Sequence, residues 1–375
     1  AGAKLEVKKI LVRNMQKKRE GVEQELLTDN WKEILEDDEI SVVIEVMGGV
    51  EPAKTMILEA LEAGKNVVSA NKDLIAEEGH VLLDTAQKNQ VDFLFEAAVA
   101  GGIPIIRPLK QCLAANDISE IVGIVNGTTN YILTKMTEEG MDFADALKKA
   151  QELGFAEADP TADVEGLDAG RKVAIMASIA FHSRVVFFNV HTEGITKITK
   201  TDIEYAKALH ASIKLLGTSK WEDDGKIYSM VAPFMIDSDH PLGHVNGVFN
   251  GIFVNGNMLG DTKFYGKGAG KLPTASAVVA DVVDAVKHQG TNIMTIWEQD
   301  KVELGDRANF ACRFFVRVAD TTSKETIEKV FGEVEYVTLA DVSGEYAFLT
   351  DKLTEGAFEE KSKQVDMIMR IRTAL

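Results

Sequence analysis

The chain has 375 residues, of which 45% are apolar, so it can form two or three domains with sizeable cores. Its 59 acids outnumber its 41 bases, and the net charge of −18 is opposite in sign to that of a typical nucleic-acid-binding protein. No apolar run could span a bilayer, the start has no signal-peptide pattern, and the two cysteines, Cys112 and Cys312, lie far apart. We expect a cytoplasmic protein with no disulfide framework and with neither nucleic acid nor membrane as a partner.

The first hundred residues alternate apolar strands with amphipathic helices. The predicted strands are Leu5–Val12, Ser41–Met47, Asn66–Ala70 and Val91–Phe95, and the predicted helices are Trp31–Glu36, Ala53–Ala63 and Asp73–Asn89. The run from Ser41 to Met47 is almost wholly apolar, as expected for a parallel strand covered on both faces. This alternation predicts an α/β fold with a Rossmann-like, doubly wound parallel sheet over residues 1–102.

The rest of the chain predicts two further regions. Residues 103–270 combine helices and a strand at Ile118–Val125 with four later strand-like runs that no helix separates, so they predict an α+β domain with an antiparallel sheet. Those runs are His210–Leu216, Lys226–Ile236, Val248–Val254 and Met258–Phe264. Residues 271–300 hold a helix that we expect to return to the first domain. Residues 305–375 predict a small α+β domain in the order β-α-β-β-α, with Glu359–Ala374 as its final helix.

The stretch from Gly154 to Lys172 is unusually acidic and precedes a predicted helix, Leu167–His182. Asp168 and Lys172 are four residues apart, so they share a helix face that continues into apolar residues, whereas Arg171 should point to solvent. A partly desolvated lysine beside a carboxylate can donate a proton near neutral pH. The alternative is an ordinary surface ion pair, which is the commoner meaning of this spacing alone.

This stretch, GFAEADPTADVEGLDAGRK, resembles the signature of homoserine dehydrogenases, G-[YF]-A-E-x-D-P-x-x-D-V-x-G-x-D-x-x-x-K, at every defining position. The resemblance implies that Lys172 gives a proton to the substrate carbonyl and that Asp168 positions both the substrate and the lysine. It implies that Glu157 binds the substrate's amino group, that Asp163 supports the same pocket, and that Gly154 lies near the cofactor. A carboxylate partner suits the ammonium of an amino-acid substrate.

Three other segments resemble the same family. Ser69-Ala70-Asn71-Lys72 ends a predicted strand, and the resemblance makes Lys72 a cofactor and substrate contact; a lysine is otherwise disfavoured at a helix start. In NGTTNYIL, from Asn126, the resemblance makes Thr128 a substrate contact, and the alternative is helix capping by Thr128 or Asn130. In YGKGAG, from Tyr265, it makes Gly268 a cofactor contact.

The segment EAAVAGGIPII, from Glu96 to Ile106, resembles a family loop that binds a monovalent cation, usually sodium. The resemblance implies one carboxylate ligand, from Glu96, and backbone carbonyl ligands from Val99, Gly101 and Ile103. Oxygen ligands of this kind suit hard cations.

The chain departs from the family at its start, where no G-x-G-x-x-G loop follows the first strand. Leu5–Val12 resembles the family's second strand, so we expect about thirty residues, the size of a β-α segment, to be missing before it. We then expect two unpaired sheet edges and weak dinucleotide binding. Arg13 follows that strand and favours the 2′-phosphate of NADP over NAD, with a solvated basic turn as the alternative.

The resemblance implies an NAD(P)-dependent enzyme that interconverts L-aspartate 4-semialdehyde and L-homoserine in threonine, methionine and isoleucine biosynthesis. It implies a homodimer or tetramer built through residues 130–260, and residues 305–375 resemble an amino-acid-binding ACT domain whose usual turn is replaced at Asp320–Lys324. One alternative is aspartate-semialdehyde dehydrogenase, but neither cysteine has the context of an activated thiolate. The other is an inactive or regulatory fragment.

Overall fold

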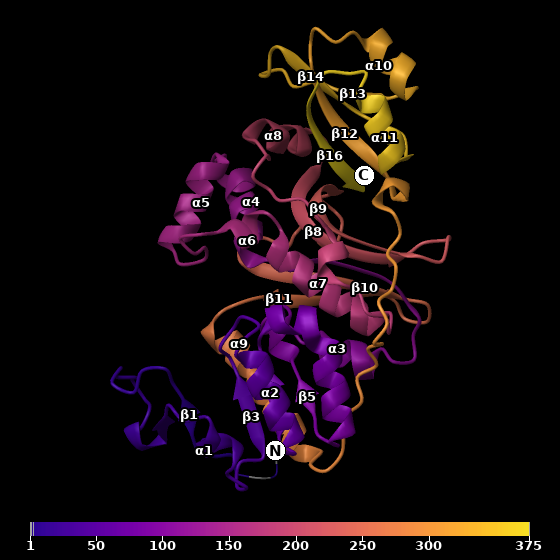
Figure 1. Cartoon of the computed structure of the whole chain (residues 1–375). Coiled ribbons are helices and arrows are strands. Elements are labelled where there is room, and N and C mark those ends of the chain that lie inside the picture. The colour runs from indigo at the N-terminus through magenta and orange to yellow at the C-terminus, as the bar shows by residue number, and fades with distance from the viewer. Residues whose placement is uncertain (1, 3, 375) are drawn as a thin grey trace.

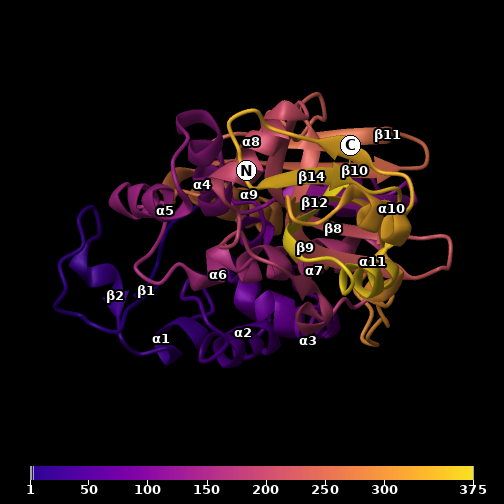
Figure 2. The same cartoon turned by 90° about the horizontal axis from the view of Figure 1, so that it is seen from above.

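The computed structural model describes residue 2 and residues 4–374. Figure 1 shows the N-terminal region, the central region and the C-terminal region stacked in chain order, with helix α9 returning to the first of them. From above, in Figure 2, the C-terminal strands lie over the strands of the central region. Among the described residues, no helix is long and apolar enough to cross a membrane.

The N-terminal region contains a parallel sheet in the order β3-β4-β5, as its alternating sequence predicts. Its strands are β3 (Val42–Glu45), β4 (Asn66–Ser69) and β5 (Phe93–Leu94), and its helices are α1 (Lys32–Leu35), α2 (Ala53–Glu62) and α3 (Lys72–Lys88). Helix α9 (Lys271–Lys287) covers one face through Ala277, Val278 and Ala285, which pack on Val68 and Leu94. This return was expected for residues 271–300.

The first predicted strand is much shorter than expected. Only β1 (Ile10–Leu11) forms, and it pairs in parallel with β2 (Leu27–Thr28) in a separate two-stranded sheet. Leu5 and Val7 are exposed, because no other described strand hydrogen-bonds to that part of the chain. The expected full strand over Leu5–Val12 is therefore wrong.

The central region carries the antiparallel strands that the sequence predicts. They are β6 (Ile118–Ile124), β8 (Ala211–Trp221), β9 (Ile227–Asp237), β10 (Phe249–Gly256) and β11 (Gly260–Lys267), in the order β11-β10-β6-β8-β9. Apolar residues of α4 (Gly127–Glu139) and α7 (Leu167–Ala180) pack against β8 in the main core. The other helices here are α5 (Phe143–Glu152), α6 (Thr161–Val164) and α8 (Lys200–Ala208), and the short strand β7 (His191–Thr192) pairs with β9.

The C-terminal region does not end in a helix, which corrects the sequence prediction. Its elements are β12 (Ala311–Ala319), α10 (Lys324–Phe331), β13 (Glu335–Val337), β14 (Glu345–Leu349), the short β15 (Leu353–Thr354), α11 (Glu355–Ser362) and β16 (Met367–Ala374). Strand β16 pairs antiparallel with β12 and parallel with β9, so a single sheet crosses from the central region into this one. These two neighbours supply backbone partners that fix residues 367–374 as a strand.

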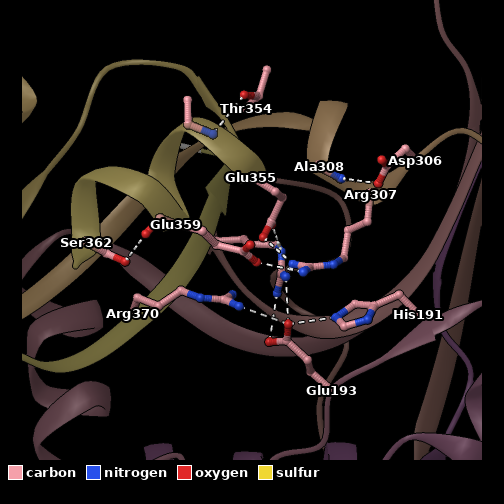
Figure 3. A network of polar contacts seen from close by, with 12 residues as sticks. His191, Glu193, Asp306, Arg307, Ala308, Thr354, Glu355, Glu359, Ser362 and Arg370 are labelled. Carbon is pink, nitrogen blue, oxygen red and sulfur yellow. Dashed lines mark hydrogen bonds and ion pairs between the residues drawn. The ribbon is translucent and has the colours of Figure 1, made fainter.

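A buried ionic network reinforces this joint between regions (Figure 3). The Glu193 carboxylate, just after β7, accepts hydrogen bonds from Arg370 at 3.0 Å, from Arg372 at 2.7 and 2.9 Å, and from His191 at 2.8 Å. Arg372 is 1% exposed and also binds Glu355 at the start of α11. Burial would raise the pKa of Glu193, but these bonds and the arginine charges hold it well below its usual range.

Candidate active site

Lys172 and Asp168 form an ion pair within α7, on the face that meets the end of β6. The Lys172 ammonium donates to Asp168 Oδ2 at 2.7 Å and to the Val125 carbonyl at 2.8 Å. The side chains are only 12% and 8% exposed, so this is not the solvated surface pair that the spacing alone would favour. Two of the three ammonium hydrogens are engaged, which leaves one for a bound molecule.

Asn126 ties the carboxylates of the cluster together, a role that the sequence did not reveal. Its amide nitrogen donates to Asp163 Oδ1 at 2.7 Å and to Asp168 Oδ2 at 2.9 Å. Its amide oxygen accepts from the Thr129 backbone at 2.8 Å, so Asn126 is also the N-cap of α4. The alternative reading, in which Thr128 or Asn130 caps this helix, is therefore wrong. An asparagine directly between a strand and a helix is the signal that could have identified it.

Two ion pairs cross from the N-terminal region into the cluster. Lys72, the first residue of α3, reaches Asp168 Oδ1 at 3.2 Å. Its neighbour Asp73 binds Arg171 of α7 at 2.7 Å. The expectation that Arg171 simply faces solvent is therefore wrong, because α3 packs against α7 and supplies a partner for it. The cluster thus lies at the junction of the two regions.

The carboxyl ends of β3 and β4 hold Lys72 in place. Asn71 caps α3 by accepting from Leu74 at 3.2 Å, and its amide nitrogen donates to the Gly49 carbonyl at 2.7 Å. Glu45 of β3 is buried and accepts a hydrogen bond from Ser69 at 2.7 Å. Ligands of open parallel sheets bind at this edge of the sheet.

Three charged groups of the cluster, Asp168, Asp163 and Lys72, have shifted pKa values. Burial would raise the pKa of Asp168, but the charges of Lys172 and Lys72 hold it well below its usual range. Burial and the nearby Asp168 charge raise the pKa of Asp163, although Asn126 opposes this. Burial alone would lower the pKa of the Lys72 ammonium, but the neighbouring Asp168 carboxylate raises it above its ordinary value. The site therefore keeps Asp168 ionised and both lysines paired with it.

Several sequence-predicted residues lie outside this hydrogen-bonded cluster. Thr128 donates to the Phe155 carbonyl at 2.7 Å and so ties α4 to the loop before α6. Glu157 is exposed, and no described contact joins its carboxylate to Asp163 or Asp168. Gly154 is an exposed glycine with φ of 75° after α5, and Arg13 is exposed beyond β1.

The segments predicted to hold a cation and a cofactor pack against each other. A side chain at Gly101 would meet the Gly268 carbonyl at 2.4 Å, so only glycine fits this approach. The Glu96 carboxylate accepts backbone hydrogen bonds from Ile105, Ile106 and Arg107 at 2.6 to 2.8 Å. Within the described chain, no hydrogen bond reaches the carbonyl oxygens of Val99, Gly101 or Ile103.

Neither cysteine is placed to act as a nucleophile in this cluster. Cys312 is buried in the C-terminal region, where burial raises the pKa of its thiol to about 12. Cys112 is exposed and follows the segment from Glu96 to Ile106, which we call the Glu96 loop. The thiolate chemistry of an aspartate-semialdehyde dehydrogenase therefore finds no support here.

Comparisons with known proteins agree with the geometry. The model of the family "Homoserine dehydrogenase" matches residues 104–283, and that of "Homoserine dehydrogenase, NAD binding domain" matches residues 1–96. A homoserine dehydrogenase of Synechocystis is 50% identical over 286 residues, which cover 75% of this chain and 66% of the relative. That of Bacillus subtilis is 47% identical over 288 residues, with 76% and 66% covered. The chain thus spans 66% of the length of these curated relatives.

Solved structures give the same result. A homoserine dehydrogenase from Thiobacillus denitrificans superimposes with a TM-score of 0.84 and 35% identity, over 92% of this chain and 85% of that one. One from S. aureus gives a TM-score of 0.81 and 38% identity, over 98% and 89%. A hyperthermophilic archaeal homoserine dehydrogenase in complex with NADPH gives 0.59 and 31%. The chain belongs to the homoserine dehydrogenase family.

Proposed function

We propose that the chain is an NAD(P)-dependent homoserine dehydrogenase that interconverts L-aspartate 4-semialdehyde and L-homoserine. The observation that carries this is the Lys172 ammonium, which is nearly buried, held by Asp168 and Val125, and has one hydrogen left over. Such a group can protonate a carbonyl oxygen as the carbonyl is reduced.

A nicotinamide cofactor, when bound, would supply the hydride chemistry for reduction of the carbonyl. Lys172 gives a proton to the carbonyl oxygen as the carbon–oxygen π bond breaks, and it regains a proton from solvent afterwards. In the oxidative direction the neutral amine takes that proton back. Asp168 keeps the lysine oriented, while Asp163 and Glu157 provide the negative charge that would hold the substrate ammonium.

The residues at the sheet edge fit a nicotinamide cofactor. Gly48 and Gly49 follow β3 in the left-handed conformation with open space around them, and Asn71 fixes that turn through the Gly49 carbonyl. Lys72, Gly154 and Gly268 would complete the cofactor contacts, and Arg13 would favour NADP through its 2′-phosphate. Replacing Arg13 with alanine should raise the KM for NADPH more than the KM for NADH.

The Glu96 loop fits a monovalent cation, because the buried residues Val99, Gly101 and Ile103 offer carbonyl oxygens that accept no hydrogen bond in the described chain. Glu96 would supply the carboxylate oxygen, and sodium is the proposed ion. Its role would be to fix the loop that packs on Gly268. Exchange of sodium for a bulky organic cation at constant ionic strength should lower thermal stability as well as activity.

We also propose a homo-oligomer built through residues 130–260. Strand β11 is the edge of the large sheet, and Met258 and Leu259 at its hairpin are 80% and 57% exposed. An unpaired sheet edge and exposed apolar side chains in the adjoining hairpin turn both favour association with another copy. Light scattering at micromolar protein concentration should give at least twice the mass of the chain.

The decisive test is the oxidation of homoserine with NADP by the wild-type chain, by Lys172→Ala and by Lys149→Ala as a control. Lys149 pairs with Glu139 on the surface of α5, outside the cluster. Lys172 acts as the general base in this direction, and loss of a positioned proton acceptor should reduce kcat by about 10²–10⁴-fold. A Lys172→Ala protein with near-normal kcat would refute the assignment. A fully inactive wild-type chain that still folds would support the fragment alternative.

A further inference from the structure

A cavity of about 290 Å³ opens at the far end of α4 from Asn126. It is enclosed by the last turns of α4, the start of β8 and the loop between β9 and β10. None of the active-site residues described above lines it. Its volume is close to the lower end of known small-molecule pockets, roughly 300 Å³, so it suits a ligand the size of an amino acid.

The floor of this cavity holds a buried cation without an acidic partner. Lys214 of β8 is 3% exposed, and its ammonium donates to the Val245 carbonyl at 2.8 Å and to Asn246 Oδ1 at 2.7 Å. Within the described chain it forms no ion pair with a carboxylate, and its third hydrogen has no acceptor. Moving an ammonium from water into the protein without a counter-ion costs roughly several kcal/mol. An apolar residue at this position would avoid that cost.

A second unmet donor lies beside it. Ser212 precedes Lys214 by two residues on β8, so both side chains lie on the same face of the strand. The Ser212 hydroxyl is buried, lines the cavity and has no hydrogen-bond partner among the described residues. Buried polar groups are normally satisfied, so two neighbouring unsatisfied donors point to an acceptor that binds from outside.

The charges around the cavity favour an anion. Its lining includes Lys214 and Lys207, of which Lys207 pairs with Glu204 at 3.1 Å, against a single carboxylate from Glu138. The Glu138 side chain accepts from the Asn246 amide at 3.4 Å, so it lies near the second partner of Lys214. A basic cavity stands out in a chain with a net charge of −18. Burial lowers the pKa of Lys214 to about 8, which keeps the ammonium form predominant at neutral pH.

We propose that this cavity is a binding site for a small molecule bearing a carboxylate or phosphate group, separate from the Lys172 cluster. One anionic oxygen accepts from Ser212 and another from Lys214. Both donors are then satisfied and the buried ammonium gains its counter-ion. The same chemistry would be met by a phosphate ester or by a free carboxylic acid.

The test is thermal unfolding with sodium phosphate or sodium acetate, compared with sodium chloride at matched ionic strength. The Tm of the wild-type chain should rise with phosphate or acetate beyond the chloride effect, and the better anion identifies the group that is bound. Calorimetry with that anion should show at least a tenfold weaker Kd for Lys214→Met and for Ser212→Ala. Lys226→Met, at an exposed turn, is the matched control and should bind as the wild type does.

Equal responses of the wild type and both variants would overturn the proposal and leave Lys214 as a structural cation for Val245 and Asn246. A failure of Lys214→Met to fold does not block the test, because Ser212→Ala removes only the hydroxyl. A wild-type Tm that follows protein concentration and ignores both anions would also overturn it, since the cavity is then filled by a second copy of the chain.

Discussion

The charges around Glu193 and those around Asp168 both join two regions, but they use their hydrogen-bonding groups differently. Glu193 accepts four hydrogen bonds from three basic side chains, and Arg372 spreads its guanidinium over Glu193 and Glu355. In the other cluster, Lys172 keeps one hydrogen free and Asp163 has Asn126 as its one described side-chain partner.

This difference separates a structural network from a binding site. A charged group whose hydrogen-bonding positions are all occupied by protein groups stabilises one arrangement of the fold. A charged group with an unoccupied position can still bind a ligand there. The protonation shifts agree. The fold favours the ionised form of Glu193 and disfavours that of Asp163. The predictions below test this contrast, from the largest effect to the smallest.

Replacing Arg372 with methionine should lower the free energy of unfolding by about 3–5 kcal/mol, because the buried Glu355 and the partly buried Glu193 lose their main partner. Urea denaturation measures this. Arg370→Met is the control: its side chain is 23% exposed and Arg372 stays in place, so the loss should be smaller. A loss of less than about 1 kcal/mol for Arg372→Met would mean that the network is no stronger than a surface pair.

Replacing Asn126 with alanine should lower kcat by roughly 10- to 100-fold, since hydrogen bonds to charged groups are worth about 1.5–3 kcal/mol. Asn126→Ser separates two roles, because serine keeps the cap of α4 but cannot bridge Asp163 and Asp168. We expect the serine variant to recover stability while its kcat stays low. Full activity in that variant would show that Asn126 matters only as a cap.

The effect of Glu193→Gln should depend on pH. The pKa of Glu193 is lowered from its ordinary value of 4.5, so its stabilising contribution is complete above that pH and is lost as the pH falls further. The difference in unfolding free energy between wild type and variant should therefore shrink below pH 4.5. A difference that stays constant from neutral to acidic pH would assign the effect to packing.

Asp163→Asn should give the smallest change, with the opposite sign. The pKa of Asp163 is raised above its ordinary value of 3.8, so the fold is penalised for the charge at neutral pH and the neutral amide removes that penalty. The variant should be slightly more stable at neutral pH, with no gain below pH 3.8, and should bind homoserine less tightly. A less stable variant would place Asp163 among the structural carboxylates.

The contrast also explains what the sequence could predict. The Asp168–Lys172 pair depends on one helical spacing, and the antiparallel strands depend on local apolar patterns. Both can therefore be predicted from short stretches of the sequence. Asn126 could not be assigned, because its partners come from α6 and α7 and meet it only in the fold. Arg171 was misjudged for the same reason, since Asp73 lies on another region.

Strand β16 shows the limit most clearly. Residues 359–374 were predicted to form the last helix, but residues 367–374 are this strand. Arg372 can be buried there because the Glu193 carboxylate, far away in the sequence, accepts two hydrogen bonds from its guanidinium and balances its charge. The roles of all the predicted site residues, Glu157, Gly154 and Arg13 included, stay predictions, because a role is defined by contact with a bound molecule; the domain boundaries stay predictions as well.

The parallel pairing of β9 with β16 also bears on how the chain folds during synthesis. Arg372 of β16 pairs with Phe234 of β9, and β7 covers β9 only at Met230 and Val231. The edge of β9 over residues 234–236 therefore stays open until the ribosome has made the whole intervening C-terminal region. An open strand edge is a template for pairing between chains. Nascent or C-terminally shortened chains should therefore be prone to aggregation and should depend on chaperones more than the finished sheet does.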